Sequence, residues 1–129
     1  DEFDKNNRRG ILNYGHTIGH AIESVAGYSD RYSHGEAIAV GMICAARISS
    51  RLGLLKSGDA SRIESLIRKC GLPVKISGIN IYGIYRSLLR DKKFIRGRTR
   101  FVLPAAIGRA RVKEGIGRPV IIRSIKDCT

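Results

Sequence analysis

The three histidines of this chain are the side chains best suited to metal chemistry, and they lie close together in the sequence. His16-Thr-Ile-Gly-His20 places two imidazoles one turn apart on the same face of an expected helix. His34 opens the next expected helix, and two antiparallel helices would bring it against His16 or His20. Neutral imidazole is a preferred ligand of zinc and related divalent ions. The pattern alone is weak, because helical histidines are more often exposed or hydrogen-bonded core residues.

The neighbours of these histidines favour a metal site. Gly15 and Gly19 each precede a histidine, and we expect them to keep this helix face open to a close neighbour. Each glycine would cost about 1 kcal/mol of helix stability. Polar Asn13 and Thr17 lie beside the same face. The partial positive charge of a helix N-terminus disfavours a charged imidazole, which would keep the ring of His34 available for a metal ion.

Hydrophobic periodicity predicts the helices that position these residues. One helix is expected over 11–26. Ser33-His34-Gly35-Glu36 has the pattern of a capping box and precedes a long apolar helix that ends near Leu52. Ser57 or Asp59 is expected to cap a third helix that closes at Gly71, and a fourth is expected over 80–89.

The rest of the chain predicts a small β-hairpin and a last helix. The basic segment 90–100 is expected to be an exposed loop. Residues 100–104 and 109–113 are expected to pair as a hairpin near residues 100–113, turning at Gly108, and Pro119 to open the last helix. The expected fold is therefore mainly α, with residues 1–129 as a single helical domain.

Composition limits the class of protein. The 129 residues are 43% hydrophobic and 27% charged, which is typical of a globular chain. Cys44, Cys70 and Cys128 are widely spaced, which favours a reducing compartment over a disulfide framework. No apolar run is long enough to span a bilayer, and no signal-peptide pattern occurs, so we expect a cytoplasmic protein without a membrane partner. The net charge of +13 suits nucleic acid, an anionic substrate or an acidic partner surface.

Two segments resemble the C-terminal, metal-binding domain of the 3-dehydroquinate synthase family, within the sugar-phosphate cyclases. They are Arg9-Gly-Ile-Leu-Asn13-Tyr-Gly-His16-Thr-Ile-Gly-His20-Ala-Ile-Glu23 and His34-Gly-Glu36-Ala-Ile-Ala-Val-Gly41-Met42. The resemblance continues through Asp91-Lys92-Lys93 and Arg100-Phe-Val-Leu-Pro104 and covers roughly residues 1–112. It implies conversion of 3-deoxy-D-arabino-heptulosonate 7-phosphate to 3-dehydroquinate and phosphate, a step of the shikimate pathway, with NAD oxidised and reduced again within the cycle.

The resemblance also implies roles for individual residues. His16 and His34 would be ligands of a divalent metal, zinc or cobalt. His20 would lie near the substrate as a hydrogen-bonding or proton-transfer group. Arg9 and Asn13 would hold anionic or hydroxyl groups of the substrate. One of Lys92 and Lys93, with Lys93 preferred, would reach its carboxylate or phosphate end. Glu23 is expected to orient a histidine or to be exposed, and Glu36 to act as a cap.

Two parts of the family's site would precede Asp1, namely a third, glutamate ligand and an N-terminal domain that binds most of the NAD. We therefore expect this chain to be the C-terminal half of a larger enzyme, to bind metal weakly alone and not to catalyse alone. Whether the full enzyme is a homodimer stays open.

Other functions remain possible from the sequence. Another sugar-phosphate cyclase or a metal-dependent alcohol dehydrogenase would share the histidine spacing, and a truncated domain without activity of its own is a further alternative. The basic run from Arg86 to Arg100 would suit a helical nucleic-acid-binding domain, but only Phe94 and Phe101 could stack on bases there. We therefore expect no specific nucleic-acid partner, and any binding to fall steeply with salt.

Overall fold

The computed structural model describes residues 13–27, 31–90 and 99–129. Within these ranges the chain forms five helices and one two-stranded sheet, which confirms the prediction of a mainly α fold with a small hairpin. The elements are α1 (His16–Val25), α2 (His34–Arg51), α3 (Ser57–Lys69), α4 (Ile81–Arg90), β1 (Arg100–Ala106), β2 (Arg109–Glu114) and α5 (Arg118–Lys126).

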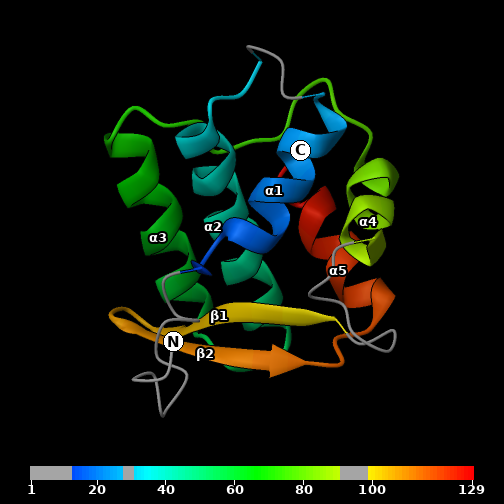
Figure 1. Cartoon of the computed structure of the whole chain (residues 1–129). Coiled ribbons are helices and arrows are strands. Elements are labelled where there is room, and N and C mark those ends of the chain that lie inside the picture. Colours follow the sequence, from blue (N-terminus) through cyan, green and yellow to red (C-terminus); the bar gives the residue numbers. More distant parts are fainter. Residues whose placement is uncertain (1–12, 28–30, 91–98) are drawn as a thin grey trace, which may run out of the picture.

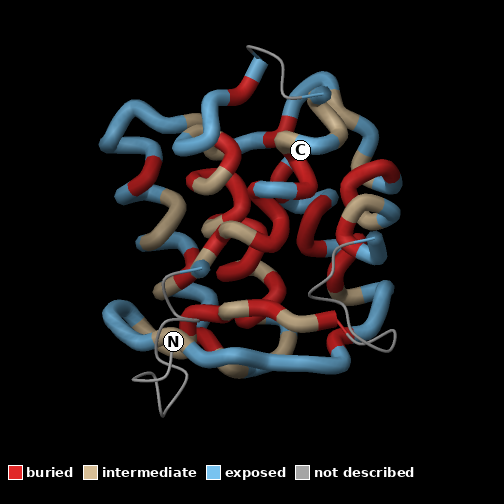
Figure 2. Tube along the Cα trace, viewed as in Figure 1, coloured by how far each residue is buried: buried red, intermediate tan, exposed pale blue. Residues whose placement is uncertain are grey.

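Helix α2 is the centre of the molecule. It packs against α1, α3, α5 and β1, with the hairpin lying across one end of the helices (Figure 1). Ten of its residues are buried, and most of them are Ala, Ile or Val. The buried segments of the other elements surround it (Figure 2). The core is therefore aliphatic, as the lack of tryptophan and the few aromatic residues require.

Three glycines allow α1 and α2 to pack very closely. A Cβ added at Gly41 would overlap the backbone carbonyl of Gly15 and lie 2.8 Å from the backbone nitrogen of Gly19. A Cβ at Gly19 would lie 3.1 Å from Cα of Ile38. The two helices are thus in backbone contact at this crossing, which only glycine permits without displacement.

The start of α1 differs from the prediction. We expected a helix over 11–26, but α1 begins at His16, and Gly15 precedes it with φ 83°. This left-handed conformation cannot continue a right-handed helix backwards. Ile11 lies outside the described residues. Gly15 therefore sets the first residue of the helix and also makes room for α2, because a Cβ there would lie 2.8 Å from the carbonyl oxygen of Ile38.

The predicted caps were partly correct. The capping box is confirmed: the Ser33 side chain accepts from the Glu36 backbone, and the Glu36 side chain accepts from the Ser33 backbone. Helix α3 instead begins at Ser57 after Lys56, without a side-chain cap, so neither Ser57 nor Asp59 caps it. Asn80 caps α4, because its side-chain oxygen accepts from the backbone nitrogen of Tyr82 at 2.9 Å.

Two buried contacts join distant parts of the chain to α2. The hydroxyl of Ser49 donates to the carbonyl of Pro104 at 2.5 Å and so ties the hairpin to α2. The thiol of Cys44 donates to Sγ of Cys128 at 3.0 Å and so joins α2 to the residues after α5. Among the described residues, no helix combines the length and apolar character needed to cross a membrane.

Candidate metal centre

The structure brings the three histidines together on one side of the α1–α2 pair. Their ring nitrogens include a set in which all atoms lie within 4.8 Å of one another. The ring centroids of His16 and His20 are 5.3 Å apart, and those of His16 and His34 are 5.7 Å apart. The predicted convergence of His16 and His34 from successive helices is therefore what the fold provides.

Helix positions explain this convergence. His16 and His34 are the first residues of α1 and α2, so both rings stand where backbone N–H groups give a partial positive charge. His20 follows His16 by one turn on the same face. Because α2 runs antiparallel to α1, the first residue of α2 reaches the far end of α1, where Glu23 lies.

Oxygen acceptors hold the Nδ1 atoms of two of the rings. Nδ1 of His34 lies 2.8 Å from Oε1 of Glu23, and Nδ1 of His16 lies 3.3 Å from the carbonyl oxygen of Tyr14. In the neutral rings these contacts require the proton to be on Nδ1, which leaves the lone pair of Nε2 free to bind a cation. A carboxylate or carbonyl behind a ligating imidazole is the usual arrangement at protein metal sites. The donor set thus fits a zinc-like ion.

The cluster faces solvent on one side. The side chain of His34 is 59% exposed and that of Glu23 is 14% exposed. His20 is exposed and His16 is half-buried. Glu23 therefore contacts His34 from the protein side, while the imidazoles face outward. A small molecule can approach the histidine cluster from solvent.

A recess of about 360 Å³ lies beside His20, between α1 and α4. Its polar lining comes from Thr17, His20, Ser24, Ser87 and Arg90. Among the described residues no acidic side chain lines it, so the hydroxyl groups and the guanidinium suit an oxygen-rich anion. Ser87 and Arg90 were not among the predicted site residues.

Other predicted site residues are less well placed or not described. Asn13 is exposed in the turn that precedes α1. Arg9, Lys92 and the preferred Lys93 lie outside the described residues. Glu36 is a cap, as predicted, and Glu23 contacts a histidine, which was one of two alternatives.

Tyr14 is a supporting residue that the sequence analysis missed. Its hydroxyl donates to the carbonyl of Met42 at 2.8 Å and joins the turn before α1 to α2. Burial raises the pKa of this phenol well above its usual value, with a smaller contribution from Cys44, so it stays protonated and keeps donating. Only its position two residues before His16 could have indicated this role.

Comparisons with known proteins point to one enzyme superfamily. The sequence profile of the family described as 3-dehydroquinate synthase C-terminal matches residues 1–94. A crystal structure of 2-deoxy-scyllo-inosose synthase, complexed with carbaglucose-6-phosphate, NAD⁺ and Co²⁺, superposes with a TM-score of 0.79 at 31% identity. The match covers 92% of this chain and 35% of that protein.

Two further structures have the same fold. Another crystal structure of 2-deoxy-scyllo-inosose synthase has a TM-score of 0.76 at 30% identity, covering 92% of this chain and 33% of that one. The 2-epi-5-epi-valiolone synthase from Streptomyces hygroscopicus subsp. jinggangensis, with NAD⁺ and Zn²⁺ bound, has a TM-score of 0.79 at 22% identity, covering 91% of this chain and 32% of that one. The chain thus spans about a third of the length of these enzymes.

Proposed function

Because the chain belongs to the 3-dehydroquinate synthase C-terminal family, we propose that it forms the metal-binding part of a sugar-phosphate cyclase that uses NAD and a divalent metal, zinc or cobalt. The finer proposal is 3-dehydroquinate synthase itself, acting on 3-deoxy-D-arabino-heptulosonate 7-phosphate. The observation that supports the metal-binding role is the convergence of His16 and His34, each with Nδ1 held by an oxygen, whereas the finer proposal rests on the sequence resemblance.

The proposed roles follow from this geometry. His16 and His34 would hold the ion through Nε2, and Glu23 would fix the orientation of His34. When bound, the metal supplies Lewis-acid polarisation of a substrate oxygen. His20 lies one turn from His16 and would exchange a proton or hydrogen bond with a substrate group at its ring nitrogen. The recess beside His20 would take an anionic end of the substrate, with Arg90 as its cation.

The remaining parts of the site are proposed to come from elsewhere. An N-terminal domain would bind most of the NAD and supply a glutamate as third metal ligand. Arg9, Asn13 and Lys93 would complete the contacts to the substrate. This chain alone would then bind metal weakly and would not turn over.

Another cyclase product is the second candidate, because two of the similar structures are of 2-deoxy-scyllo-inosose synthase at 30% and 31% identity. The substrate separates the two. An enzyme carrying this domain should release phosphate from the heptulosonate phosphate in the presence of NAD and zinc or cobalt. Release from a hexose 6-phosphate instead would assign it to the second candidate.

The residue roles are tested by alanine substitutions in that full-length enzyme. His16→Ala and His34→Ala should each abolish metal retention through gel filtration and abolish turnover. His20→Ala should reduce turnover while most of the metal stays bound, so it is the matched control for the loss of an imidazole. If all three variants keep metal and activity, the assigned roles are wrong.

A further inference from the structure

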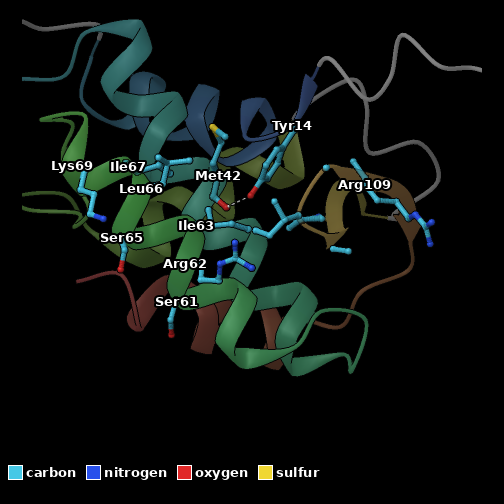
Figure 3. A pocket seen from close by; sticks show the side chains of 15 residues that line it. Tyr14, Met42, Ser61, Arg62, Ile63, Ser65, Leu66, Ile67, Lys69 and Arg109 are labelled. Atoms are coloured by element: carbon cyan, nitrogen blue, oxygen red, sulfur yellow. Dashed lines mark hydrogen bonds between the residues drawn. The ribbon is translucent and has the colours of Figure 1, made fainter.

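A second cavity lies away from the histidines, among α3, the turn of the hairpin and the start of α1 (Figure 3). Its volume is about 690 Å³, which falls within the roughly 300–1,000 Å³ of small-molecule sites. None of the three histidines lines it. It is therefore separate from the proposed metal centre.

The wall of this cavity is largely apolar. Tyr14 and Met42 form one side, Ile63 and Leu66 of α3 another, and Ile107 of the hairpin turn a third. Leu66 is 64% exposed and Ile107 is 50% exposed, the two largest values among the exposed large hydrophobic residues of the described chain. An apolar molecule seated here would cover apolar surface of both side chains, and removing that surface from water favours binding.

Cations stand at the rim. Lys69 and Arg109 lie toward opposite ends of the cavity (Figure 3), and within the described ranges neither has a carboxylate at ion-pair distance. Arg62, a third cation in the lining, is 3.6 Å from Asp59. No acidic side chain of residues 13–27, 31–90 or 99–129 contributes to the lining itself. Within the part of the chain that the structure describes, the cavity thus combines an apolar wall with a positively charged rim.

We propose that this cavity is a binding site for a small molecule with an apolar body, aromatic or branched aliphatic, and one anionic group such as a carboxylate or sulfonate. The body would lie against Met42, Ile63 and Leu66, and the anion would pair with Lys69 or Arg109. The hydroxyl of Tyr14 would not contribute, because it already donates to Met42. Charge complementarity at the rim is the reason to choose an anionic ligand over a neutral one.

Two fluorescent probes of similar shape test this proposal on the 129-residue chain. They are 8-anilinonaphthalene-1-sulfonate and its uncharged relative N-phenyl-1-naphthylamine. The sulfonate should bind with one-to-one stoichiometry and at least about fivefold more tightly than the neutral probe. Its binding should shift the NMR signals of the Met42 and Ile107 methyl groups.

Substitutions then assign the charge effect. The double variant Lys69→Gln/Arg109→Gln should bind both probes with equal affinity, and its affinity for the neutral probe should equal that of the unaltered chain. The matched control Arg68→Gln/Arg111→Gln removes the same charge from exposed positions outside the lining and should keep the fivefold preference. Equal binding of the probes to the unaltered chain, or multiple sulfonates per chain, would overturn the proposal.

Two other occupants give different results. If a second copy of the chain fills the cavity, light scattering will show a dimer. The probe will then either fail to bind or bind only as the dimer dissociates. If another part of a longer enzyme polypeptide fills it, the sulfonate will bind the 129-residue chain but not the longer protein. Either result refutes a small-molecule site. Zinc titration of the same samples tests the histidine cluster separately, so failure of one proposal is distinguishable from failure of the other.

Discussion

Gly41 sets how closely α1 approaches α2, and one added methyl group tests whether the histidine geometry depends on that approach. A Cβ at this position would overlap the carbonyl of Gly15 and lie 2.8 Å from the nitrogen of Gly19, whereas ordinary contacts begin at 3.4 Å. Both neighbours are backbone atoms, so no side-chain rotation relieves the overlap. In Gly41→Ala, α1 must therefore shift by more than 0.6 Å, the difference between 2.8 and 3.4 Å, because the overlap with the Gly15 carbonyl is deeper than the contact with Gly19.

Two opposing effects decide the stability of this variant. Alanine gains about 1 kcal/mol over glycine inside a helix. Overpacking against rigid neighbours costs about 1–3 kcal/mol, and a clash with two backbone segments falls at the upper end. We expect a net loss of about 1–2 kcal/mol in the free energy of unfolding, or about 4–8 °C in Tm.

The same shift acts on the metal centre. His16 and His20 move with α1, while His34 is fixed to α2. Metal-to-ligand distances tolerate changes of only about 0.2 Å, so displacement of one helix should lower the zinc affinity by about tenfold. Chemical denaturation measures the stability change without zinc, and competition with a chromophoric chelator measures the affinity.

Gly58→Ala in α3 is the matched control. This glycine is also helical, but an added Cβ would meet nothing within 4 Å, so we expect neutral or slightly raised stability and unchanged zinc affinity. If Gly41→Ala behaves like Gly58→Ala in both measurements, the close crossing does not set the geometry of the histidines.

Two further predictions concern the contacts behind the site and the core. Glu23→Gln should lower zinc affinity by about 10- to 100-fold, because its carboxylate holds Nδ1 of His34. Glu64→Gln loses ion pairs with Arg47 and Arg68 but should leave zinc affinity unchanged. An equal loss of zinc affinity in both variants would contradict the role of Glu23. A disulfide reagent should modify one thiol per native chain rapidly, the exposed Cys70. The hydrogen bond to buried Cys128 and burial itself raise the pKa of Cys44, which leaves little thiolate to react. Three rapidly reacting thiols would disprove the packing of the C-terminal residues on α2.

Features encoded by neighbouring residues were predictable from the sequence. The capping box at Ser33 and Glu36 needs only four residues, and the hairpin needs an apolar strand before Gly108 and a short strand of alternating charged and apolar residues after it. The first residue of α1 was not predictable in this way. Gly15 adopts a positive φ while packed beside Ile38 and Met42, so a neighbouring helix takes part in ending the helical pattern.

In the site, too, features set by neighbouring residues were predictable and features set by packing between helices were not. The spacing of His16 and His20 places both rings on one helical face, whatever the rest of the fold. The approach of His34 depends on the α1–α2 crossing, and periodicity alone did not mark Gly41 as its contact point. Glu23 had two possible roles until the antiparallel pairing brought it to His34. The apolar cavity joins side chains from Tyr14 to Ala110, and no local pattern predicts such an assembly.

The exposure of the histidine cluster helps to distinguish a catalytic metal site from a structural one. Structural zinc is enclosed by four protein ligands, whereas a catalytic metal keeps a position for water or substrate. Here the rings of His20 and His34 face solvent, and the nearest described carboxylate holds Nδ1 of His34 instead of pointing at the shared centre. The described part of the chain thus supplies nitrogen ligands from one side. This arrangement favours a metal that acts on an external substrate, because a metal that only stabilised the fold would gain most from ligands on every side.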